Sequence, residues 1–166
     1  MKKETIRAIV DIIVAENKEI IVLKEEYWNE VIDSKWLESR HKDRYNEIDY
    51  RVVHNKLFLY VHKDENDIMA SGPWNRRGVN YDNQLNDYII DMNGILRIGI
   101  GWKHNCYTEF PYCVLGAGRM IVGRDGIIHY IDNHSGHYRP TEEEFNNSLK
   151  YLDHLTIAHK YVWDYS

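Results

Sequence analysis

The fold is decided by residues 88–100, which read YIIDMNGILRIGI. Two apolar runs flank the pair Asn93-Gly94, which favours a type I′ turn because both residues accept positive φ values. The stretch therefore predicts an antiparallel hairpin. Residues 119–131, RMIVGRDGIIHYI, repeat this arrangement around Asp125-Gly126 and predict a second hairpin. Together the two hairpins indicate an antiparallel sheet.

Further elements are expected before these hairpins. Residues 51–62 are β-branched and aromatic around Asn55-Lys56 and predict another hairpin. Apolar residues recur at helical spacing over 4–15 and over 25–40, which predicts two N-terminal helices. Residues 63–84 are rich in turn formers and predict a long loop that serves as a lid, a contact surface or a mobile tip.

A helix start is predicted directly after the second hairpin. Thr141 caps the N-terminus, and Glu144, three residues later, completes a capping box. This helix is expected to run to about Leu155, followed by a last strand within 157–163. The pattern as a whole predicts a single α+β domain over residues 1–166. Its N-terminal helices pack on a mostly antiparallel, hairpin-built sheet that a C-terminal helix closes.

Composition narrows the function classes. The 166 residues carry a formal net charge of -5, so nothing draws the whole chain to phosphate backbones, and double-stranded DNA is a disfavoured partner. No signal peptide or spanning segment can be drawn, which predicts a cytoplasmic protein without a membrane partner. Usage rich in Lys, Ile, Asn and Tyr indicates a bacterial or phage origin. Thirteen Tyr and five Trp favour either a binding face or an aromatic rim of the core.

The densest set of polar groups lies between the second hairpin and the capped helix. It reads DNHSGHYRP over residues 132–140. A strand end and a helix N-terminus favour an anion, so we expect a site there for a phosphate-bearing small molecule or RNA. In this hypothesis His137 is the general acid or base, assisted by His134, and Arg139 holds the anion. The ligand-orienting residues are Ser135, Tyr138 and Asp132.

The same residue types also satisfy the backbone of any tight strand-to-helix connection, and the two readings carry equal weight. His134 and His137 with Asp132 and His104 are compatible with a metal, but no established metal-ligand spacing accompanies them, so no metal and no cofactor is predicted. Cys106 beside His104 is a minor candidate for a thiolate and its base.

Residues 116–141, which contain the string SGHYRP, resemble a segment of poorly characterised bacterial proteins, some of them toxin- or effector-like. The resemblance implies a hairpin, an exposed loop and a helix, and it implies no particular activity.

Two functions follow as alternatives. The first is a small protein with a catalytic or ligand site in the SGHYRP loop that acts on a nucleotide or RNA. The second is a non-catalytic protein-binding module, of an inhibitor or immunity type, that uses a Tyr- and Trp-rich surface; an acidic net charge suits it.

Overall fold

The structure is a computed structural model that describes residues 2–32, 47–60, 84–99, 104, 108 and 110–165. The elements of this part of the chain are α1 (Lys3–Glu16), β1 (Ile21–Val22), the 3-10 helix η1 (Glu25–Tyr27), α2 (Trp28–Ile32), β2 (Glu47–Val53), β3 (Lys56–Tyr60), β4 (Leu85–Ile90), β5 (Leu96–Gly99), β6 (Cys113–Val114), β7 (Gly116–Val122), β8 (Ile128–Asp132), α4 (Glu142–Ser148), the 3-10 helix η5 (Leu149–Leu152) and β9 (Lys160–Tyr161).

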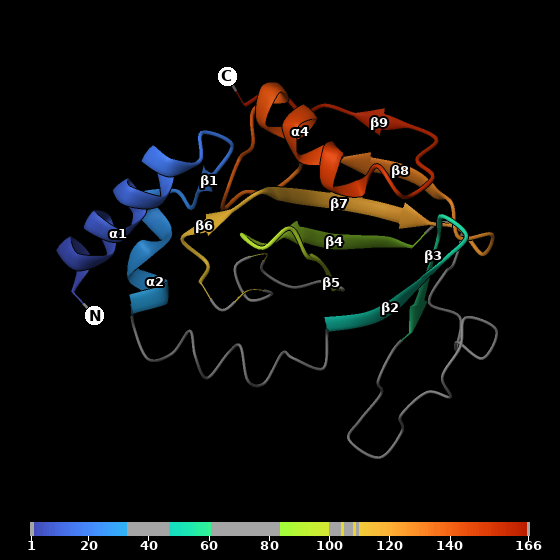
Figure 1. The fold of residues 1–166 in the computed structure, drawn as a ribbon, viewed down its shortest axis with the longest axis horizontal. Coiled ribbons are helices and arrows are strands. Elements are labelled where there is room, and N and C mark those ends of the chain that lie inside the picture. The colour runs from blue at the N-terminus through green and yellow to red at the C-terminus, as the bar shows by residue number, and fades with distance from the viewer. Residues whose placement is uncertain are drawn as a thin grey trace, which may run out of the picture.

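Seven of the strands form one curled sheet in the order β3-β2-β5-β4-β7-β8-β9 (Figure 1). Each neighbouring pair is antiparallel except β8 and β9, which run parallel. Strands β1 and β6 form a separate antiparallel pair. The α+β class and the mostly antiparallel, hairpin-built sheet are therefore confirmed.

The curl brings the tip of the β2–β3 hairpin against the β7–β8 turn. The Leu57 backbone N–H donates to the Gly126 carbonyl at 2.8 Å, and Thr156 N–H donates to Asn55 O at 3.0 Å. A Cβ built on Gly126 would lie 2.6 Å from the Lys56 Cβ, so no side chain fits between the turn and β3. Glycine at 126 thus lets the first and last parts of the sheet meet.

The turn types differ from the sequence prediction. Gly94 and Gly126 have φ of +80°, but Asn93 and Asp125 do not have positive φ, so neither turn is type I′. In both, the glycine N–H bonds the carbonyl three residues earlier, which is a three-residue loop with glycine in the left-handed position. The expected positive φ pair occurs instead at His54 (50°) and Asn55 (66°), one residue before the predicted turn.

The N-terminal helices lie together beside β1 and β6 (Figure 1). Ile6 and Val10 of α1 are buried, as the helical spacing predicted. Trp28 is 1% exposed, and its indole N–H donates to Leu23 O at 2.8 Å. Of the predicted helix 25–40, residues 25–32 are helical and the rest lies outside the described residues, as does the predicted 63–84 loop up to residue 83.

The C-terminal elements are shorter than predicted. The capping box of Thr141 and Glu144 is present, but α4 ends at Ser148 and continues only as η5 to Leu152. The Ser148 hydroxyl donates to Phe145 O at 2.6 Å, a bond to the helix's own backbone that weakens a regular helix. The last strand is reduced to β9, with an isolated bridge between Ile128 and Ile157.

Candidate functional site

The SGHYRP loop begins at Asp132, which is fully buried at the end of β8. Its carboxylate accepts hydrogen bonds from the Arg119 N–H (2.9 Å), the His134 N–H (2.9 Å) and the Tyr130 hydroxyl (2.7 Å). The Arg119 guanidinium adds bonds of 3.1 and 2.9 Å. Burial opposes the charge of Arg119, but Asp132 outweighs it and raises the pKa of the guanidinium. Asp132 is thus an anchor of the loop whose acceptor capacity is used within the fold.

Asn133 is equally buried and ties the loop to the C-terminal tail, defined here as residues 160–165. Its amide donates to Pro140 O at 2.8 Å and to Trp163 O at 3.0 Å. Its side-chain oxygen accepts from the Trp163 N–H at 2.7 Å. Asn133 was not among the predicted site residues, and it positions the tail.

The middle of the loop is a compact turn held from inside. Ser135 and Tyr138 are fully buried. The Tyr138 N–H donates to the Ser135 hydroxyl at 3.3 Å, and the Tyr138 hydroxyl donates to Pro111 O at 2.6 Å. Arg139, at a positive φ of 44°, closes the turn with its N–H on Ser135 O at 2.8 Å. Ser135 and Tyr138 therefore support the loop from beneath its surface.

The outer side chains of the loop contact the N-terminal helices. Arg139 pairs with Glu26 at 2.6 Å and lies 3.4 Å from the Tyr27 hydroxyl. The His137 ring lies on Tyr27, with centroids 4.1 Å apart, and its Nε2 is 3.7 Å from a Glu30 carboxylate oxygen. His137 O also accepts the Lys24 N–H at 3.0 Å. His137 and Arg139 are thus brought together, on the side of η1 and α2.

His134 contacts a different part of the fold. Its ring meets the Trp163 ring edge-on, with centroids 4.6 Å apart. The two histidines of the hypothesis are therefore engaged with different elements, His134 with the tail and His137 with η1. The structure uses each predicted site residue in an internal contact, and whether any of them acts on a ligand stays a prediction.

A second polar cluster, formed by His104 and Asp87, lies near Asp132. His104 is 7% exposed, and its Nε2 is 2.7 Å from Gly118 O, so this nitrogen carries a hydrogen. Burial lowers the pKa of His104, opposed by the nearby Asp87 carboxylate at 3.7 Å. The sequence drew attention to His104 as a possible metal ligand and as a partner of Cys106, which lies outside the described residues.

Cys113 is buried, which raises the pKa of its thiol to about 12, so it stays protonated at neutral pH. Within the described ranges, no group of three or more His, Cys, Asp or Glu side chains is placed to hold a metal ion.

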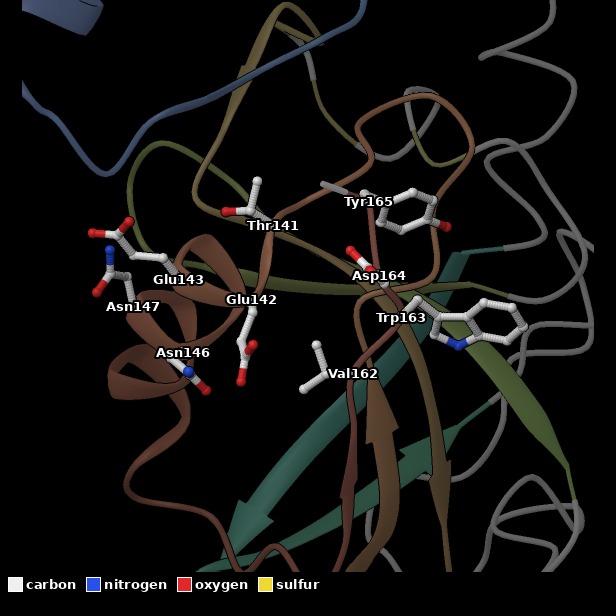
Figure 2. A pocket seen from close by; sticks show the side chains of 9 residues that line it. All are labelled: Thr141, Glu142, Glu143, Asn146, Asn147, Val162, Trp163, Asp164 and Tyr165. Carbon is white, nitrogen blue, oxygen red and sulfur yellow. The ribbon is translucent and has the colours of Figure 1, made fainter.

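A pocket of about 900 Å³ lies between α4 and the tail (Figure 2). It is lined by Thr141, Glu142, Glu143, Asn146, Asn147, Val162, Trp163, Asp164 and Tyr165. Three of these residues carry carboxylates and none carries a basic group. The capping box already uses the backbone N–H of Glu144, and the first turn of α4 is wholly acidic. The lining of the pocket is therefore acidic.

The comparisons with known proteins give one partial match. A family model for the middle domain of IQ motif-containing proteins matches residues 103–145, or 43 of 166 residues. This stretch contains the SGHYRP segment, so the resemblance to toxin- or effector-like bacterial proteins was wrong and the segment is similar to that middle domain. No curated protein and no solved structure matches the chain significantly.

None of the helices in the described residues combines the length and the apolar character that crossing a membrane requires.

Proposed function

We propose that this protein is a non-catalytic protein-binding module whose contact surface is the C-terminal tail with the adjoining pocket. The observation that carries the proposal is the concentration of exposed apolar side chains in the tail. Tyr161, Val162 and Trp163 are 54%, 37% and 38% exposed, and two of them line the pocket. Aromatic side chains that stay partly exposed around a hollow are typical of interfaces.

The hydrogen bonds within the SGHYRP loop favour a binding module over an enzyme. Asp132, Asn133, Ser135 and Tyr138 hold backbone and side-chain partners from inside the fold. Such bonds give the tail and the start of α4 a fixed relative position. A rigid pair of walls is what a binding pocket needs, because little ordering entropy is then lost on association.

Site-specific photocrosslinking tests the proposal. Benzoylphenylalanine replaces Val162 in one protein and Ile12, which is 60% exposed on α1, in a matched control. In an extract of the source organism we expect a discrete crosslinked protein, identified by mass spectrometry, from position 162 and not from position 12. Excess unlabelled wild type should suppress it. Crosslinks of equal yield from both positions, or from neither, contradict the proposal.

The second candidate function is a catalytic or ligand site in the SGHYRP loop that takes a phosphate-bearing substrate. Its specific support is the pair His137 and Arg139, which lie together against Tyr27. A ligand at these residues would have to compete with Glu26 and Glu30 for them.

A further inference from the structure

We infer that the partner contributes an extended, basic segment that adds as a strand to the outer edge of the tail and places a Lys or Arg side chain in the pocket. The inference rests on the proposed function and names the partner's chemistry and mode of binding.

Strand β9 ends the sheet order, and no other described strand pairs with its outer edge. His159 O accepts the Ile131 N–H at 3.1 Å, and both backbone groups of Trp163 bond the Asn133 side chain. Backbone groups of successive residues in an extended strand point to opposite edges. Since residues 159 and 163 face β8 and Asn133, the N–H and C=O groups of Lys160 and Val162 face away from the sheet.

The pocket lies on this outward side. Figure 2 shows the tail forming one wall and α4 the other, with the Glu142 side chain lying between the helix and Val162. A peptide paired with the outer edge of Val162 would therefore run between the tail and α4. Strand addition of this kind takes its affinity from the main chain and its specificity from pockets for alternate side chains.

The charge of the pocket selects the side chain. Glu142 and Glu143 line it, and none of the residues that line it is basic. The Val162 side chain lines the same pocket and supplies apolar surface for the methylene stem of a lysine or arginine. An acidic or phosphorylated segment would be repelled, so charge complementarity favours a basic partner.

Fluorescence anisotropy at low salt tests the inference with an end-capped, fluorescein-labelled peptide of eight residues. The peptide alternates threonine and valine around one central arginine. We expect binding that weakens about fivefold when neutral citrulline replaces the arginine, the size of one exposed ion pair. Glu142→Gln should weaken the arginine peptide by a similar factor and leave the citrulline peptide unchanged. The control Glu16→Gln removes an equal charge from α1 and should leave both unchanged.

Two further peptides, N-methylated on complementary sets of alternate residues, report the strand geometry. Only one set of amides can face the tail, so one methylated peptide should lose binding at least tenfold while the other keeps it. Equal binding of the arginine and citrulline peptides, or of the two methylated peptides, overturns the inference. If crosslinking at position 162 nevertheless captures a partner, the proposed function stands and only its chemistry is wrong. If crosslinking and peptides both fail, the proposed function fails with it.

Discussion

Asn133 and Trp163 are joined by two hydrogen bonds in opposite directions. The Asn133 side-chain oxygen accepts the Trp163 N–H at 2.7 Å, and its amide donates to the Trp163 carbonyl at 3.0 Å. Strand β8 ends at Asp132, and beyond it the backbone of the tail is hydrogen-bonded to the Asn133 side chain. This pair fixes one wall of the pocket to the end of the sheet, although the two residues are thirty positions apart.

Replacing Asn133 should loosen the tail. We expect Asn133→Ala to lower the free energy of unfolding by about 2 kcal/mol, because it leaves a buried carbonyl of Pro140 and part-buried backbone groups of Trp163 without their partner. For a chain of this size that corresponds to a thermal midpoint lower by about 5 °C. Urea unfolding and thermal melts, both followed by circular dichroism, measure the two quantities.

The control for this variant is Asn146→Ala, an exposed asparagine of α4. Alanine is the better helix former, so stability should stay level or rise slightly. Amide hydrogen exchange adds a local readout: Asn133→Ala should accelerate exchange at Trp163 and leave α1 unchanged. A variant that melts like wild type with a protected Trp163 would show that the two bonds do not hold the tail.

Two glycines offer a matched test of the curled sheet. Gly126 combines a φ of +80° with a Cβ position 2.6 Å from Lys56 Cβ and 2.9 Å from Phe58 Cζ. We expect Gly126→Ala to cost about 2 kcal/mol or more, from the left-handed backbone and the clash together. The opposite holds at Gly136, where a Cβ meets nothing within 4 Å and φ is not positive.

Gly136→Ala should therefore change stability by less than about 1 kcal/mol, with a gain from the reduced entropy of the unfolded chain. Chemical denaturation of both variants measures the difference. If the two alanines cost the same, the contact between the β7–β8 turn and β3 does not hold the sheet in its curl.

The sequence alone identified the features that depend on residues close together in the chain. The capping box of Thr141 and Glu144 lies within four residues, and the turns at Gly94 and Gly126 depend on local φ, so pattern alone located them. Even there the turn type was wrong, because Asn-Gly fits both a type I′ turn and a three-residue loop whose glycine is left-handed. The choice between them depends on the register of the flanking strands.

The candidate sites could not be predicted to the same extent. Arg139 and Glu26 are 113 positions apart, and Asn133 and Trp163 thirty, so no local period connects them. The pocket joins residues 141–147 to residues 162–165, which meet only because β9 returns beside β8. The sequence singled out the loop by its density of polar groups, but it could not show that Asp132, Asn133, Ser135 and Tyr138 make their hydrogen bonds inside the fold.

His104 predicts a dependence of stability on pH. Burial lowers its pKa below the usual value of 6.5, opposed by Asp87 on β4 and Asp132 on β8 and assisted by His134. The unfolded chain then binds the proton more readily than the folded one. The contribution of neutral His104 to stability is thus fully present above pH 6.5 and is lost as the pH falls through the folded pKa.

We therefore expect the thermal midpoint of wild type to fall between pH 7 and pH 5 more steeply than that of His104→Gln, which cannot take up the proton. Glutamine can still donate to Gly118 O. An imidazole signal in proton NMR that is missing from His104→Gln should titrate below 6.5 in wild type. A titration above 6.5 would mean that the carboxylate of Asp87 outweighs burial.

His137 distinguishes the binding module from the enzyme. Its ring packs on Tyr27 with centroids 4.1 Å apart, and the side chain is only 18% exposed. If the loop is architecture, His137→Ala should lower the free energy of unfolding by about 1 to 2 kcal/mol, the usual cost of losing a packed aromatic contact. His159→Ala, at an exposed histidine before β9, should cost nothing measurable.

Thermal melts with and without a panel of nucleotides then distinguish a binding module from a catalytic or ligand site. A catalytic or ligand site predicts that a nucleotide raises the wild-type midpoint and that His137→Ala abolishes this rise while melting like wild type. We expect the reverse: a lower midpoint for His137→Ala, and no nucleotide that shifts wild type.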